Sequence, residues 1–290
     1  MLFTNNRKRF SVRPLLMTRG EPTLGLSNGP TCSTSCHWKK KKIRKHRKWK
    51  KKKKKTPPST DYKKEKFLDL NILQANVCGL ERKKIHLAKL FNDKKVHVAV
   101  LQETLHSSCD IHITGYTPYP CRCNNCQGII TYIRNDIQGE VELLDWHPTD
   151  AQKVSLWHGN SKLTLYNIYC PPSTTLRFME QSTTYKKTVI AGDLNGHSPL
   201  WGYTDLDNTG KKIEEICQST NLILLQDENS PKTLLHRRHG TLHRPDLTLV
   251  SADLSNNCSE EVLECISSDH RPILTKIQLP KLKQRKRRTR

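Results

Sequence analysis

Several short segments of the chain place carboxylate, amide and imidazole side chains beside apolar runs. They are Asn76, Glu103, Asp193, Asn195, Asp246, Asp269 and His270. Carboxylates with an amide suit Mg²⁺, because a hard cation takes oxygen ligands and keeps several waters. A carboxylate can also deprotonate an attacking water, and a histidine oriented by a second carboxylate can stabilise charge on a phosphate. Together these residue types indicate metal-assisted hydrolysis of a phosphodiester.

Short predicted strands must bring these side chains together. Apolar runs with β-branched residues lead into Asn76, Glu103 and Asp193, and two more begin just after Asp246 and His270. Each position alone has a simpler explanation, because Asp and Asn favour turns and turns occur at strand ends. Their recurrence beside an apolar run in one domain favours a shared rim of a sheet instead.

A sixth run, LTLYNIYCPP, delivers Tyr169 at its end and is stopped by two prolines. Helices are predicted over residues 80–92 and 210–220, where apolar residues recur at spacings of three and four. In the first helix Ile85 belongs to the apolar set. Strands mixed with helices in one domain predict an α/β sandwich with sheets inside and helices outside.

The formal net charge of +23 lies in the two ends of the 290-residue chain. Residues 1–66 carry 22 Lys and Arg against three Asp and Glu, and KLKQRKRRTR closes the sequence. We therefore expect a disordered basic arm over 1–66, a globular domain over 67–279 and a basic tail over 280–290. Dense positive charge predicts a nucleic-acid partner and a nuclear location, with the cytoplasm as the alternative; a solvated tail without a specific partner is the simpler reading.

No apolar segment resembles a secretory signal or a membrane span, so no membrane partner is expected. The 11 cysteines are an odd number, which argues against a disulfide framework. Cys121, Cys123 and Cys126 have the spacing of half a zinc site, but the second pair of ligands is missing. A surface loop is the favoured interpretation of this cluster.

Six motifs in order resemble the endonuclease/exonuclease/phosphatase superfamily, which includes apurinic endonucleases and the DNase I group. They are QANVCGL, LQET, NIYCPP, GDLNGHSPLWG, PDLTLV and SDHRP. The block from Gly192, followed by TGKKIEEICQSTNLILLQD, looks most like the endonuclease domain of non-LTR (LINE-type) retrotransposons. The resemblance implies a four-layered α/β sandwich of the DNase I type and a Mg²⁺-dependent endonuclease, with Mn²⁺ able to substitute.

The resemblance also implies a role for each matching residue. Asp193 would activate the water, Asn195 and Tyr169 would hold the phosphate, and His270 paired with Asp246 would contact the scissile phosphate. Glu103, Asn76 and Asp269 would form the metal side of the site. Some relatives have an acidic residue where this chain has Cys78. DNA is the implied substrate, nicked to leave a 3′-hydroxyl that primes reverse transcription in the parent element.

Residues around this motif set carry further expectations. The run HRRHGTLHR predicts a DNA-backbone contact by Arg237, Arg238 and Arg244, or else an exposed loop. Trp201 is expected to pack under the active-site turn, and His197 to line the wall of the site.

Two other functions stay open. One is a catalytically decayed remnant that still binds nucleic acid, and the other is a phosphatase or phosphodiesterase of the same superfamily acting on a small phosphate. The basic arms favour nucleic acid over a small-molecule phosphate.

Overall fold

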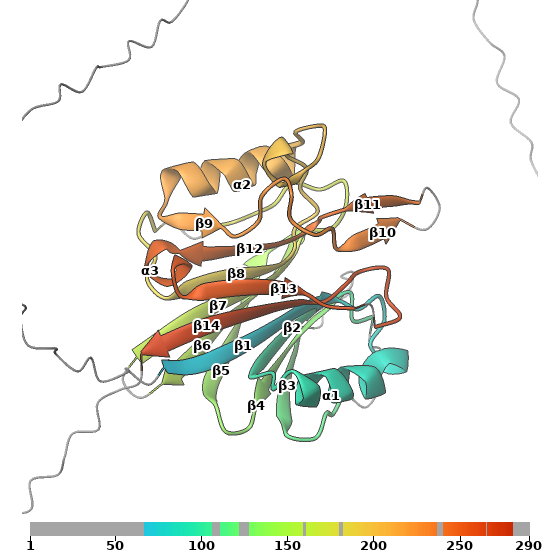
Figure 1. Ribbon diagram of the computed structural model, residues 1–290, viewed down its shortest axis with the longest axis vertical. Coiled ribbons are helices and arrows are strands. Elements are labelled where there is room, and N and C mark those ends of the chain that lie inside the picture. The colour runs from blue at the N-terminus through green and yellow to red at the C-terminus, as the bar shows by residue number, and fades with distance from the viewer. Residues whose placement is uncertain are drawn as a thin grey trace, which may run out of the picture. The chain divides into compact units, whose positions relative to one another are not determined.

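The computed structural model describes residues 67–105, 111–121, 128–158, 161–179, 182–236, 240–264 and 266–280. Two six-stranded sheets face each other in this part of the chain (Figure 1). Residues 1–66 and 281–290, which the sequence predicts as basic arms, lie outside the described residues. No helix among the described residues is long and apolar enough to cross a membrane.

The first sheet has parallel strands at its centre and antiparallel strands around them. Its order is β13 (Cys258–Val262), β14 (Ile273–Pro280), β1 (Phe67–Asn76), β2 (Val98–Gln102), β4 (Ile129–Arg134) and β3 (Tyr116–Cys121). β1 and β2 run parallel, whereas β14 pairs with β1 in the antiparallel sense. The helical segment η1 (Glu81–Lys83) and α1 (Lys84–Asp93) connect the two parallel strands.

The second sheet repeats this arrangement. Its order is β5 (Gln138–Trp146), β6 (Thr149–His158), β7 (Ser161–Tyr169), β8 (Thr188–Asp193), β12 (Asp246–Ser251) and β9 (Leu222–Leu224). β7 and β8 are its parallel pair, and β12 returns antiparallel to β8. The remaining elements are η2 (Pro199–Trp201), α2 (Asn208–Ser219), the hairpin β10 (Leu234–His236) and β11 (Thr241–His243), and α3 (Ala252–Ser255).

Three apolar clusters define four layers. Ile72 and Val100 of the first sheet pack with Leu165 and Ala191 of the second, so this cluster lies between the sheets. The outer face of the first sheet packs against α1 through residues such as Phe91. The outer face of the second sheet packs against α2, where Ile213 and Ile216 are buried. The predicted α/β sandwich is therefore confirmed, with helices outside the two sheets.

Alternation along the central strands decides what reaches the site. In β1, Ile72 lies between the sheets while Leu73 packs on the α1 side. In β8, Ala191 lies between the sheets while Ile190 packs on the α2 side. Because side chains alternate along a strand, the last residues Asn76 and Asp193 also point between the sheets. The polar ends of the strands thus extend the inner face of the sandwich.

Both predicted helices exist with shifted bounds. The first begins as η1 and continues as α1 to Asp93, and the second spans Asn208–Ser219. The prediction for Ile85 was wrong, since its side chain is 80% exposed whereas Leu87 and Phe91 are buried. Ile85 and Leu87 are two residues apart in α1, about 200° around the helix axis, so Ile85 lies on the face opposite the buried one.

Candidate active site

The ends of the central strands meet at one rim of the sandwich. β1 and β2 end together, with Asn76 opposite Gln102, and β7 and β8 end together, with Tyr169 opposite Asp193. β12 begins where β8 ends, because Asp246 pairs with Asp193 in the antiparallel register. The predicted shared rim is therefore present. It follows from the parallel pairs, whose carboxyl ends must lie on the same side.

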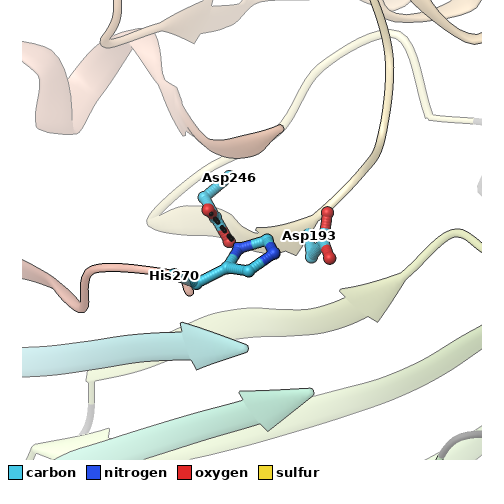
Figure 2. A group of neighbouring side chains, drawn as sticks. All are labelled: Asp193, Asp246 and His270. Atoms are coloured by element: carbon cyan, nitrogen blue, oxygen red, sulfur yellow. Dashed lines mark hydrogen bonds and ion pairs between the residues drawn. The ribbon is translucent and has the colours of Figure 1, made fainter. Parts of the chain in front are cut away.

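His270 reaches this rim from the segment before β14. Its Nδ1 lies 2.8 Å from Asp246 Oδ2, and both side chains are buried. Figure 2 shows the imidazole ring between the carboxylates of Asp246 and Asp193. The ligand atoms of these three residues all lie within 4.8 Å of one another. The sequence-predicted pairing of His270 with Asp246 is thus observed in the structure.

Asn76 joins the two halves of the site. Its Nδ2 donates to Glu103 Oε1 at 2.8 Å and to Asp193 Oδ2 at 2.8 Å. The Tyr169 hydroxyl donates to the same Glu103 oxygen at 3.1 Å. One amide and one phenol therefore hold two carboxylates that come from different sheets. Cys78, where some relatives are acidic, donates its backbone N–H to Asn76 Oδ1 at 3.1 Å.

The segments beyond the strand ends turn sharply to present their side chains. Glu103 and Asn195 both have a φ of 47°, a left-handed conformation that is uncommon outside glycine. Asn195 Nδ2 donates to the backbone oxygen of Cys170 at 3.0 Å, which fixes the turn against the end of β7. Such backbone strain is tolerated where the surrounding structure imposes it, typically at functional sites.

Asp269 lies beside this cluster and is half-buried. Ser268 ties its segment to β1, because the Ser268 hydroxyl donates to the backbone oxygen of Asn76 at 2.9 Å. The same hydroxyl lies 3.3 Å from Asp269 Oδ1. The structure thus brings together all eight residues that the sequence assigned to catalysis and metal binding: Asn76, Glu103, Tyr169, Asp193, Asn195, Asp246, Asp269 and His270.

Burial and mutual charge set the protonation of the central groups. Burial raises the pKa of Asp193 to about 7, and the nearby Asp246 charge adds to the effect. Burial alone would lower the pKa of His270, but the Asp246 charge and hydrogen bond raise it to about 10. Burial likewise opposes ionisation of Asp246, yet its contact with His270 holds its pKa below the usual range. At neutral pH the pair is therefore an imidazolium bound to a carboxylate.

Two neighbouring sets of side chains could hold a cation. The first is Asp193, Asp246 and His270, but a protonated imidazole has no free lone pair for a metal. The second consists of oxygen donors from Asn76, Glu103 and Asp269, which suit a hard divalent ion. Asp193 Oδ1 is buried and has no hydrogen-bond partner among the described residues, so this edge of the site has unused acceptor capacity. The donor chemistry fits Mg²⁺ or Mn²⁺.

Comparisons with known proteins agree with this geometry. Residues 163–274 match the sequence profile of a family described as endonuclease-reverse transcriptase. The endonuclease domain of TRAS1, a telomere-specific non-LTR retrotransposon, aligns at a TM-score of 0.58 and 18% identity, covering 72% of this chain and 99% of that chain. The motif resemblance to the endonuclease/exonuclease/phosphatase superfamily is confirmed.

Other solved structures share the superfamily fold. The AP endonuclease LMAP from Leishmania major has a TM-score of 0.57 and 16% identity, covering 73% of this chain and 88% of its own. The 3′ phosphatase NExo from Neisseria, bound to a product DNA hairpin, has a TM-score of 0.55 and 14% identity, covering 72% and 99%. At these identities the likeness establishes the fold. No curated protein sequence matches the chain.

Three arginines were predicted to contact DNA, and the structure describes one of them. Arg237 and Arg238 lie outside the described residues. The prediction for Arg244 was wrong, because its side chain is fully buried and forms an ion pair with Glu260. Its guanidinium also donates to the backbone oxygen of Pro231. Arg244 therefore anchors the hairpin base and is not available to a DNA phosphate.

Of two other residues in the GDLNGHSPLWG motif, Trp201 is where the sequence predicts it, whereas the place of His197 in the wall of the site stays a prediction. Trp201 is fully buried, and its Nε1 donates to the Gly196 oxygen at 2.9 Å, so it packs under the turn that follows Asp193. His197 is partly exposed and pairs with Asp205 at 3.0 Å. Cys123 and Cys126 lie outside the described residues, so the surface loop favoured for the cysteine cluster stays a prediction.

Sequence reasoning missed two partners of Asp246. Thr233 donates its hydroxyl to Asp246 Oδ2 at 2.6 Å, and Gln74 donates its amide to Asp246 Oδ1 at 2.8 Å. Thr233 lies in an irregular segment before β10, and no pattern marks it. Gln74 did carry a signal, because it continues the inward alternation of Leu70 and Ile72 and should therefore be buried.

Proposed function

We propose that this chain is a metal-dependent endonuclease that hydrolyses a DNA phosphodiester and leaves a 3′-hydroxyl at the nick. The observation that carries the proposal is the buried trio of Asp193, Asp246 and His270. The Asp193 carboxylate, with a pKa near 7, can act as a base, and the neighbouring His270 imidazolium can bind a negatively charged phosphate. Hydrolytic activity as such is what the superfamily resemblance supports.

Asp193 acts as the general base in this mechanism. Its buried carboxylate takes a proton from the attacking water as the water oxygen bonds to phosphorus. The bond from phosphorus to the 3′ oxygen then breaks, and that oxygen takes a proton from solvent. The products are a 3′-hydroxyl and a 5′-phosphate. Asn76, which donates to Asp193 Oδ2, keeps the other oxygen of the carboxylate directed toward the water.

His270 stabilises the negative charge that develops on the phosphate. Its Nδ1–H is held by Asp246, so the opposite nitrogen can donate to a phosphate oxygen. Asn195 has a second amide hydrogen for the phosphate, and the Tyr169 hydroxyl, which donates to Glu103 in this structure, can turn to the phosphate when Glu103 binds the cation. Burial raises the pKa of Tyr169, which therefore stays protonated. When bound by Glu103, Asn76 and Asp269, a divalent cation supplies further neutralisation of this charge.

DNA is the proposed substrate class. The net charge of +23 favours a polyanion, and the TRAS1 domain that shares the fold comes from a non-LTR retrotransposon. The 3′-hydroxyl would then prime reverse transcription by a polymerase of the parent element. The basic segment 39–55 supports a nuclear location. Fusing this segment to a fluorescent protein and imaging its distribution in cells tests this.

A nicking assay tests the proposal. The full chain is incubated with supercoiled plasmid and Mg²⁺, beside Asp193→Asn, His270→Ala and the control Asp205→Asn, whose carboxylate is exposed. We expect nicking by wild type and control, a loss of about 10²–10⁴-fold for Asp193→Asn, and no nicking with a chelator. Direct extension of the nick by a DNA polymerase identifies the 3′-hydroxyl.

The two alternatives give different outcomes. A decayed remnant binds DNA in a salt-sensitive manner but does not cut it, although the chain is folded. A phosphatase releases inorganic phosphate from a 3′-phosphorylated DNA end or an inositol phosphate without nicking the plasmid. The NExo fold match makes the 3′-phosphorylated end the first substrate to compare.

A further inference from the structure

A layer of buried polar side chains, four amides and one hydroxyl, lies between the sheets beneath the site. Its members are Gln74, Gln102, Thr131, Gln152 and Asn167, none more than 2% exposed. They occupy the inward positions of β1, β2, β4, β6 and β7, between the apolar core and the strand ends. Burying an amide costs free energy unless its hydrogen bonds are made, so such a layer calls for a physical reason.

Gln74 connects this layer to the site. Its Nε2 donates one hydrogen to Asp246 Oδ1 at 2.8 Å and the other to Gln102 Oε1 at 2.9 Å. The first bond crosses from one sheet to the other. Both amide hydrogens of Gln74 are therefore used, and one of them holds the carboxylate that orients His270.

The next members of the layer fix the direction of this bond. Gln102 Nε2 donates to Asn167 Oδ1 at 2.7 Å, so Gln102 must present its oxygen toward Gln74. Asn167 Nδ2 in turn lies 3.3 Å from the Thr131 hydroxyl and 3.4 Å from Gln152 Oε1. Gln102, Asn167 and Gln152 thus each direct their amide oxygen toward the preceding member of the series, whereas Gln74 directs its N–H groups to Gln102 and Asp246.

The series ends on a group that cannot reverse. Gln152 Nε2 donates to the backbone oxygen of Tyr119 at 2.8 Å, and a carbonyl can only accept. The backbone oxygen in β3 therefore fixes the donor-to-acceptor direction of each hydrogen bond in the series, up to the bond between Gln102 and Gln74. A flipped Gln74 would place its amide oxygen against the Asp246 carboxylate, which is repulsive.

We propose that Gln74 is a positioning residue for the Asp246–His270 pair, held in its donating orientation by the amide series. Gln74 occupies Oδ1 of Asp246, while Thr233 and His270 occupy Oδ2. Hydrogen bonds on both oxygens therefore restrict rotation of the carboxylate. The catalytic consequence depends on the proposed endonuclease function, whereas the positioning of His270 does not.

Kinetics of Gln74→Met test the catalytic consequence. Methionine keeps the length of the side chain and removes the amide donors. We expect kcat for plasmid nicking to fall about tenfold with KM unchanged, as for partners that orient a ligand or base. The matched control is Gln226→Met, which removes a buried amide bonded to Glu260 and to the Thr248 N–H, away from Asp246. We expect the control to stay within about twofold of wild type, because a general loss of stability would affect both variants.

A double-mutant comparison adds a second criterion. In an Asp246→Asn background the positioning function is already lost, so Gln74→Met should reduce kcat no further. If Gln74 acted independently of Asp246, the fold reductions in kcat of the two single variants would instead multiply in the double variant.

A spectroscopic measurement is independent of turnover. The ring N–H signal of His270, assigned by its absence in His270→Ala, reports on the bond to Asp246. We expect it to shift in Gln74→Met and to stay in place in Gln226→Met. Should Gln74→Met fail to fold, Gln102→Met tests the same idea, because it leaves Gln74 in place and removes the acceptor that orients it, together with the donor to Asn167.

The outcomes separate the inference from the proposed function. A Gln74 variant, or its Gln102 substitute, with wild-type kcat and an unshifted His270 signal would overturn the positioning role. A wild-type chain that cuts no DNA, but whose His270 signal responds to Gln74→Met, would contradict the endonuclease proposal and support the positioning role.

Discussion

Asp193 lies buried between Asp246 and the amide of Asn76, with one carboxylate oxygen unpaired among the described residues. Its pKa is raised by burial to about 7 in the folded chain, against an ordinary value of 3.8. A carboxyl group whose pKa is raised by folding contributes most to stability below its ordinary pKa, and this contribution is lost as the pH rises toward 7. The proposed base therefore makes the fold less stable at working pH.

Asp193→Asn should consequently stabilise the metal-free chain while abolishing nicking. We expect a higher melting temperature than wild type at pH 8 in a chelating buffer, and a difference that shrinks as the pH falls from 7 toward 4. Thermal unfolding followed by circular dichroism measures this. Equal melting temperatures at pH 8 would mean that Asp193 is hydrated or paired in solution.

Arg244 has a structural role that its sequence context hides. It is fully buried against Glu260, so Arg244→Met removes the cation from a largely buried carboxylate that then keeps only the Gln226 amide as a partner. We expect a loss of about 3–5 kcal/mol in the free energy of unfolding, with much of it restored in the double variant Arg244→Met, Glu260→Met. Urea unfolding of the three proteins measures this, and an unchanged salt dependence of DNA binding in the double variant would confirm that Arg244 does not contact phosphate.

Among the elements, the parallel strands β7 and β8 approach each other closely near the site. A Cβ on Gly192 would overlap the Ile168 backbone oxygen. The glycine directly before Asp193 is therefore required for the two strands to approach each other, which places Asp193 opposite Tyr169.

Gly192→Ala should separate the strands and cost about 3 kcal/mol or more. Gly139→Ala is the matched control in the same sheet, because its Cβ would meet chiefly the movable end of the Ile133 side chain. We expect the control to unfold close to wild type in urea. Comparable losses in both variants would show that the effect is one of strand propensity, not of close approach.

The elements also show where sequence reasoning succeeds. Apolar runs that end on polar residues predicted the strands and their shared rim, because alternation and turn chemistry are local properties. The buried face of α1 was not predictable in this way, since Ile85 and Leu87 are both apolar and lie on opposite faces of the helix. Nor was the burial of Arg244, whose partner Glu260 lies in β13, 16 residues further along the chain. The alternation in β1 indicates that Gln74 is buried, but not that its partner is Asp246, 172 residues away.

At the scale of the whole molecule, the positive charge of residues 1–66 contrasts with the acidic site. Replacing Lys51 to Lys55 by serine should weaken DNA binding and flatten its salt dependence, by about 0.9 in the logarithmic slope for each phosphate that is no longer neutralised. Nicking at saturating DNA should stay unchanged, because the site itself is intact. Arginine at the same five positions is the control, and it should retain the slope in a binding titration over salt concentration.

The position of β14 has a consequence for when activity can arise. This strand lies beside β1 in the middle of the first sheet, although Ser268, just before it, is separated from its partner Asn76 by 192 residues. Ribosomes add about 5–20 residues per second, so β1 waits for roughly 10–40 s before its neighbour exists. A nascent chain therefore exposes Asn76 and Glu103 without His270, and under the proposed function it cannot cut nucleic acid while it is still being made. The order of strands along the chain would then delay the proposed activity until His270 has been translated.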